Sequence, residues 1–272
     1  MTTATVRPLH LDRHLRGSSA LRSEWIKMRT VRSTMWSLVA MAVITIGVAI
    51  LGTVTVNWSS ISLVSRLTFD PTSRSLTGLL FSELVIAVLG ILVMSAEYGT
   101  GTIRATLAAN PNRPRVLATK SAVFAAVAVV MGEALAFGAF LIGQALLRSP
   151  APHATLGQTG VLRAVVGGGL MVAALGLFAL GLATIIRHTA GALTAFVGVF
   201  FVLPILVEAL PTSIGHPIGE YLPFNISSTM TTVGHTFGKS PALSPWVGFA
   251  VVCGYAVIAL VVGGVLMVRR DA

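Results

Sequence analysis

The sequence holds a single cysteine, Cys253, and six histidines that show no close metal-binding spacing. One cysteine excludes an intramolecular disulfide framework and a cysteine-based zinc site. No grouping of serine, histidine and aspartate supports catalysis, so neither an enzyme nor a metal or cofactor bound by this chain is expected. Charged residues make up only 10% of the chain, against roughly 25% in soluble domains. The composition therefore excludes an ordinary soluble protein.

Apolar residues dominate instead, at 54% of the 272 residues, and the mean hydropathy is +0.86. A helix needs about 20 apolar residues to cross a hydrocarbon core of roughly 30 Å. Six stretches reach that length and predict an all-α integral membrane protein with six transmembrane helices. Residues 1–17 are expected to form a cytoplasmic tail, and residues 18–272 a single transmembrane domain. The predicted spans are 36–56, 76–96, 120–147, 161–186, 189–210 and 245–268.

The distribution of the 19 lysines and arginines predicts the orientation. With a cytoplasmic N-terminus, most of them lie inside, and this bias sets topology. Both termini are therefore expected in the cytoplasm, with some attraction to anionic membrane lipids. The basic residues are spread over separate loops, which disfavours nucleic acid as a partner. Arginine far outnumbers lysine, which points to a GC-rich genome and a bacterial plasma membrane. The basic residues expected outside are Arg66, Arg74, Arg148, Arg163 and Lys239.

The segment "SSALRSEWIKMRTVRSTMW" precedes the first span and mixes apolar and basic residues at helical spacing. Ser18 or Ser19 can serve as its N-cap. The pattern predicts an amphipathic helix in the inner membrane interface, anchored by Trp25; a cytoplasmic extension of the first span is the alternative. The apolar face is expected to hold Leu21, Trp25, Met28 and Met35, and the basic face Arg22, Lys27, Arg29 and Arg32.

The segment "EYGTGTIRATLAANPNRPRVLATK", residues 97–120, separates the second and third spans. Gly99 and Gly101 are expected to end the second span, because glycine is a weak helix former. Thr100 or Thr102 can then cap a new helix. The pair Asn110-Pro111 should end that helix, because proline disfavours a helical residue before it.

The helix predicted between these signals is about two turns long and carries Ile103 and Leu107 on one face, with Arg104 beside them. A helix this short is marginal in water by itself. We therefore expect Ile103 and Leu107 to enter a groove of a partner protein while Arg104 contacts its rim. A basic loop that only fixes orientation is the alternative.

Acidic residues within the spans are candidates for function. A charge near the middle of a bilayer costs roughly 2.5–3.5 kcal/mol, so Glu133, near a helix centre, is expected to be neutral, paired or facing a wet cavity. It is either a polar point on a substrate path or a structural hydrogen-bond partner. Glu83, a second candidate for the path, and Glu208 lie nearer the outer ends, where snorkelling favours a structural role.

Small residues four apart allow close helix packing. Gly132 and Ala136 form such a pair in the third span, and Gly169 and Ala173 form one in the fourth. Internal packing is the favoured interpretation, and a dimer interface is the alternative.

The fifth span contains Pro204 and should kink there. A long outer connection follows, with short helical pieces broken at Pro217 and Pro223, and it is expected to dip back into the membrane as re-entrant helices. Its end, "GHTFGKS", has only three residues between the glycines, one fewer than a phosphate-binding loop needs. A nucleotide site in this chain is therefore not expected.

Three quoted stretches, "SEWIKMRTVRSTMW", "EYGTGTIRATLAANPNRPRVLATK" and "YLPFN", resemble the permease subunits of ABC-2 type transporters in order and spacing. The resemblance implies that the N-terminal segment is an elbow helix and that the 97–115 segment contains a coupling helix seated in an ATPase subunit. Arg187 and His188, between spans four and five, would form a second ATPase contact. By matching position, the coupling region is Glu97, Gly99, Thr100, Gly101, Thr102, Arg104, Asn110 and Arg113.

The resemblance also implies partners and activity. Two permease subunits, as a homodimer or heterodimer, would work with two ATPase subunits that bind ATP and Mg, mostly in export. A mostly apolar cavity would suit lipids, hydrophobic peptides or amphiphilic drugs. The alternative is a self-contained secondary transporter, because spans 1–3 and 4–6 have opposite topology, as in inverted repeats. A membrane enzyme is disfavoured by the lack of clustered catalytic groups.

Overall fold

A computed structural model describes residues 13–269, except residues 61, 110–111 and 235–242. The described residues are helices and connecting loops without strands, and six helical segments are long and apolar enough to cross a membrane. The prediction of an all-α protein with six candidate spans is confirmed.

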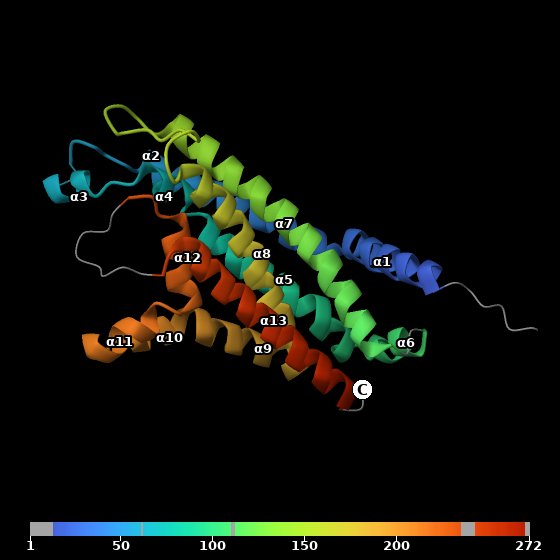
Figure 1. The fold of residues 1–272 in the computed structure, drawn as a ribbon. Helices are drawn as coiled ribbons and strands as arrows, with labels where there is room; N and C mark the ends of the chain where they lie inside the picture. The colour runs from blue at the N-terminus through green and yellow to red at the C-terminus, as the bar shows by residue number, and fades with distance from the viewer. Residues whose placement is uncertain (1–12, 61, 110–111, 235–242, 270–272) are drawn as a thin grey trace, which may run out of the picture.

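The helical segments follow one another along the chain (Figure 1). They are α1 (Arg13–Thr30), α2 (Arg32–Val54), α3 (Leu63–Leu67), α4 (Pro71–Leu76), α5 (Leu79–Gly99), α6 (Thr102–Ala109), α7 (Arg113–Leu146), α8 (Val161–Ile186), α9 (Thr189–Val197), the π-helix η1 (Gly198–Val202), α10 (Leu203–Glu208), α11 (Thr212–Gly219), α12 (Pro223–Thr231) and α13 (Pro245–Arg269).

Helix α8 forms the centre of the bundle and packs against α5, α7 and α13. Glycines allow this close approach: a Cβ atom on Gly132 of α7 would lie 2.4 Å from the carbonyl oxygen of Gly169. Ala136 and Ala173 are also buried within the chain. Both predicted small-residue pairs therefore serve internal packing.

The N-terminal helix differs from its prediction. Helix α1 begins at Arg13, so Ser18 and Ser19 lie inside it and neither can be its N-cap. The expected tail, 1–17, is thus partly helical, and residues 1–12 lie outside the described residues. Val31 has an extended conformation and separates α1 from α2.

Prolines shape the fifth span and the connection after it. The π-helix η1 ends at Val202, two residues before Pro204. Proline lacks an N–H and would crowd the carbonyl of residue 200 in a regular α-helix. Pro217 lies inside α11, so the predicted break there is wrong. Pro223 begins α12, as expected of proline in a first helical turn. Helices α3 and α4 had no counterpart in the sequence prediction.

The bundle has two distinct ends (Figure 1). One, here called the α6 end, gathers α6, the start of α7, the α8–α9 turn and the end of α13, and α1 extends beyond the bundle on this side. The opposite end, called the α12 end, gathers α3, α4, α11 and α12. The predicted coupling residues lie at the α6 end, except Asn110, which is outside the described residues.

Candidate functional site: an ion network at the α6 end

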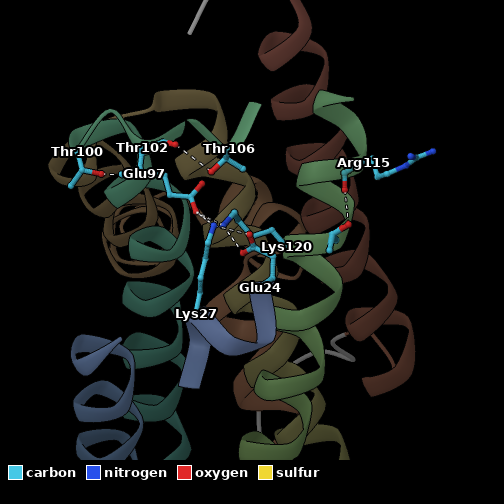
Figure 2. A network of polar contacts seen from close by, with 9 residues as sticks. Glu24, Lys27, Glu97, Thr100, Thr102, Thr106, Arg115 and Lys120 are labelled. Carbon is cyan, nitrogen blue, oxygen red and sulfur yellow. Dashed lines mark hydrogen bonds and ion pairs between the residues drawn. The ribbon is translucent and has the colours of Figure 1, made fainter. Parts of the chain in front are cut away.

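Four charged side chains from three helices meet at the α6 end (Figure 2). The Lys120 ammonium of α7 lies 2.8 Å from Glu24 Oε2 of α1 and 2.9 Å from Glu97 Oε1 of α5. The Lys27 ammonium of α1 lies 3.0 Å from Glu24 Oε1 and 3.0 Å from Glu97 Oε1. We call these four residues the ion network.

Local sequence explains how the ion network assembles. Glu24 and Lys27 are three residues apart and share one face of α1. Glu97 lies in the last turn of α5 and Lys120 about two turns into α7, so the short α6 segment brings them to the same level although 23 residues separate them. Met28 is buried beside Glu24 on the bundle side of α1.

Burial makes this pairing necessary. The Lys120 side chain is only 3% exposed, and a buried charge is costly unless it is paired. Burial alone would raise the pKa of Glu24, but Lys120 and then Lys27 outweigh it and hold that pKa below 4.5. Burial alone would lower the pKa of Lys27, but Glu24 and Glu97 raise it above 10.5. Glu24 and Lys27 are therefore held in their charged forms, within a network of two carboxylates and two ammonium groups.

The ion network corrects two sequence expectations. Glu97, assigned to the ATPase contact, directs its carboxylate to the chain's own lysines. Lys27, assigned to the basic face of the N-terminal helix, is paired with two carboxylates of the bundle side. The network cannot be read from the sequence alone, because Glu24 and Lys120 are 96 residues apart. The presence of Glu24 in an otherwise basic helix was the one available signal.

Helix α6 uses its apolar face within the chain. Ile103 is 2% exposed and belongs to the hydrophobic core, and Leu107 packs against that core. The expectation that Ile103 enters a partner's groove is therefore wrong: this burial is what stabilises a helix too short to persist alone. The outward face carries Arg104, Ala105 and Ala108, all exposed.

The start of α6 is shaped by glycine and threonine. Helix α5 ends at Gly99 as predicted, and the Thr100 hydroxyl donates to the Ala96 carbonyl at 2.8 Å. Thr100 therefore closes α5, and its hydroxyl also lies 2.9 Å from the Thr102 hydroxyl. Gly101 has a φ of +71°, in the left-handed region that favours glycine. Helix α6 ends at Ala109, as the Asn110-Pro111 signal predicts, although Asn110 itself lies outside the described residues.

Two arginines of the predicted coupling set hold the end of α13. Arg113 donates from Nη1 to the Met267 carbonyl at 2.7 Å, and Arg187 donates from Nη2 to the Leu266 carbonyl at 3.0 Å. Such contacts satisfy carbonyls that the last helical turn leaves free and complement its dipole. The Arg187 guanidinium also lies 5.2 Å from the Tyr98 ring centroid.

His188 differs from its neighbour Arg187. It is exposed at the start of α9, where its Nδ1 accepts from the Gly191 amide at 3.3 Å. Of these two residues of the α8–α9 turn, His188 is exposed and Arg187 is half-buried, so His188 is the more accessible one.

Comparisons with known proteins give no match: no protein-family model and no curated protein is similar to this chain at a significant level. Among the described residues, no three or more histidine, cysteine, aspartate or glutamate side chains are placed to hold a metal ion.

The two candidate substrate-path glutamates have different surroundings. Glu83 is 1% exposed and accepts a hydrogen bond from the Ser227 hydroxyl of α12. Glu83 does not snorkel but is buried, and its hydrogen bond to α12 agrees with the structural role that the sequence favoured. Glu133 is half-buried against Gly169 of α8, where a Cβ atom would lie 2.8 Å from the carboxyl carbon. Its place on a substrate path stays a prediction.

The predicted elbow residues divide between two faces of α1. Met28 is 8% exposed and faces the bundle, whereas Leu21 and Trp25 are each 44% exposed. Arg29 is exposed, as is Arg32 at the start of α2. The expectation that Met28 shares one face with Leu21 and Trp25 is therefore wrong.

Proposed function

We propose that this chain is the permease subunit of an ABC exporter, with the α6 end in the cytoplasm of a bacterial cell. The observation that supports this best is the setting of α6. It is a separate helix between two candidate spans, fixed to the bundle by Ile103, with Arg104, Ala105 and Ala108 directed outward. The resemblance of its sequence to ABC-2 coupling helices supports the same assignment.

The corrected docking surface is therefore the outward face of α6, together with His188. Small side chains at Ala105 and Ala108 let another protein's surface approach the helix closely, and Arg104 offers a charged contact. Ile103 supports docking only indirectly, because it fixes α6 to the chain's own core.

The ion network suggests how motion would be transmitted. Because Lys120 joins α7 to Glu24 of α1 and Glu97 of α5, a push on α6 would move these three helices together. In the proposed cycle, ATP closes two ATPase subunits, α6 carries the motion to α5 and α7, and a cavity between two permeases opens outward. ATP and Mg belong to the ATPase, and α11 and α12 would be the re-entrant helices near the exit.

The test uses the outward face of α6. The chain is co-expressed with the stand-alone ABC ATPase that the proposal expects to be encoded beside its gene. Co-purification and ATP hydrolysis are measured in Ala108→Trp. A bulky side chain there should block docking without disturbing the core. The matched control is Ala145→Trp, exposed on α7 at the opposite end of the bundle, which should bind the ATPase normally.

Two results would contradict the proposal. Undiminished ATPase binding and coupling in Ala108→Trp would remove α6 as the contact. Transport driven by an ion gradient in vesicles that hold this chain alone would instead support the secondary-transporter alternative.

A further inference from the structure

Helix α1 has two chemically different faces. Residues spaced at 100° per position place Glu24 and Met28, both buried, toward the bundle. Arg22 and Arg29 lie on the opposite side, and Trp25 and Ile26 lie between them along the helix. Trp25 is 44% exposed and Ile26 is 49% exposed. The outward face is thus a stripe of alternating basic and bulky apolar side chains.

The same chemistry continues across the junction with α2. Arg32 is exposed at the start of α2, and Trp36, one turn later, is 71% exposed. We call Arg22, Trp25, Ile26, Arg29, Arg32 and Trp36 the outward stripe.

The positive charge of the outward stripe is unbalanced. Within the described part of the chain, the ion pairs of α1 use only Glu24 and Lys27, and no carboxylate pairs with Arg22, Arg29 or Arg32. Glu24 cannot serve them, because it faces the bundle and already contacts both lysines of the ion network. The stripe therefore lacks counter-charges while the inner face of α1 is neutralised.

We propose that the outward stripe binds anionic phospholipid. Only Val31 separates α1 from α2, a candidate membrane span, so the stripe begins where the bilayer surface meets the protein. Tryptophan favours the headgroup level, and a guanidinium can form two hydrogen bonds to a phosphate. An amphipathic basic helix with exposed tryptophan binds such surfaces by apolar insertion and charge attraction together.

This binding would add a role to α1 beyond positioning the first span. Because Glu24 and Lys27 tie the inner face of α1 to the helices on either side of α6, headgroup binding on the outer face stabilises the arrangement of the α6 end. The inference stands on the charge and exposure of α1 and does not require the proposed ATPase partner.

The test measures lipid preference by tryptophan fluorescence. The full chain with Trp58→Phe and Trp246→Phe keeps Trp25 and Trp36 as reporters and is reconstituted in phosphatidylcholine vesicles. Brominated phosphatidylglycerol or brominated phosphatidylcholine is then added at increasing fractions as a quencher. Phosphatidylglycerol should quench at a lower fraction, and 1 M salt, with a Debye length near 3 Å, should reduce the difference.

The decisive variant is Arg22→Gln, Arg29→Gln in the reporter background. Its preference for phosphatidylglycerol should fall by up to roughly twenty- to thirty-fold, the effect expected for two basic residues at an anionic surface. The matched control, Arg74→Gln, Arg148→Gln, removes the same charge from exposed positions at the α12 end and should keep the preference.

Three results would overturn the proposal. They are equal quenching by both lipids in the reporter protein, an unchanged preference in Arg22→Gln, Arg29→Gln, and an equal loss in the control. Loss of a co-purifying protein from that variant, with no lipid preference in the reporter protein, would assign the stripe to a protein partner instead.

Discussion

Replacing Lys120 by methionine tests whether the ion network stabilises the α6 end. Methionine keeps most of the side-chain volume and removes the ammonium group. The Lys120 side chain is 3% exposed and lies within 3 Å of both Glu24 and Glu97, whose side chains are 9% and 13% exposed. After the substitution, two largely buried carboxylates share only Lys27, whose side chain is 44% exposed.

Removing one partner of a buried ion pair costs about 3–5 kcal/mol. Lys27 still neutralises part of the charge, so we expect the lower end, about 3 kcal/mol. The matched control is Lys27→Met, the same substitution in the same network at a far more exposed position. Its cost should be below about 1 kcal/mol, as for a surface pair.

The free energy of unfolding can be measured in mixed detergent micelles by titration with a denaturing detergent, followed by circular dichroism. Adding Glu24→Gln to Lys120→Met should recover part of the lost unfolding free energy, because one unpaired carboxylate disappears. The stability change of the double variant should differ from the sum of the two single changes by about 1 kcal/mol or more. Equal costs for Lys120→Met and Lys27→Met would refute the reasoning, because burial would then not control the strength of the network.

Three further predictions concern pH, packing and topology. The pKa of Glu24 is lowered, so its contribution to stability is full above pH 4.5 and is lost as pH falls through the folded-state pKa. The pKa of Lys27 is raised, so its contribution to stability is full below pH 10.5 and is lost as pH rises through the folded-state pKa. Unfolding titrations at several pH values should therefore show a stability plateau between these limits, and a maximum below pH 4.5 would contradict this. Gly132→Val should lower the unfolding free energy by roughly 1–3 kcal/mol or more, because its Cβ would lie 2.4 Å from a backbone carbonyl oxygen of α8; unchanged stability would exclude close α7–α8 packing. In a Cys253→Ser background, Ser65→Cys should react with an impermeant thiol reagent in intact cells and Thr102→Cys only after permeabilisation, and the reverse pattern would invert the proposed topology.

Composition and periodicity determined the class of this protein. Runs of about 20 apolar residues have few stable arrangements besides helices that satisfy their own backbone hydrogen bonds. This is why the predicted span 161–186 coincides with α8 and why the other five spans were also found. Gly99, Gly101 and the Asn110-Pro111 pair likewise predicted the limits of α6, because backbone preferences act locally.

Tertiary structure decided which side chains are available for contact. The apolar pair Ile103 and Leu107 looks the same in sequence whether it faces a partner or the chain's own core, and only the position of α6 against the bundle showed that Ile103 is buried. Glu97 and Lys120 likewise appear as isolated charges in the sequence, but the fold pairs them with each other and α1 adds Glu24 and Lys27 beside them. Helical periodicity predicts that a residue lies on a face, but which neighbour covers that face depends on contacts between residues far apart in the chain.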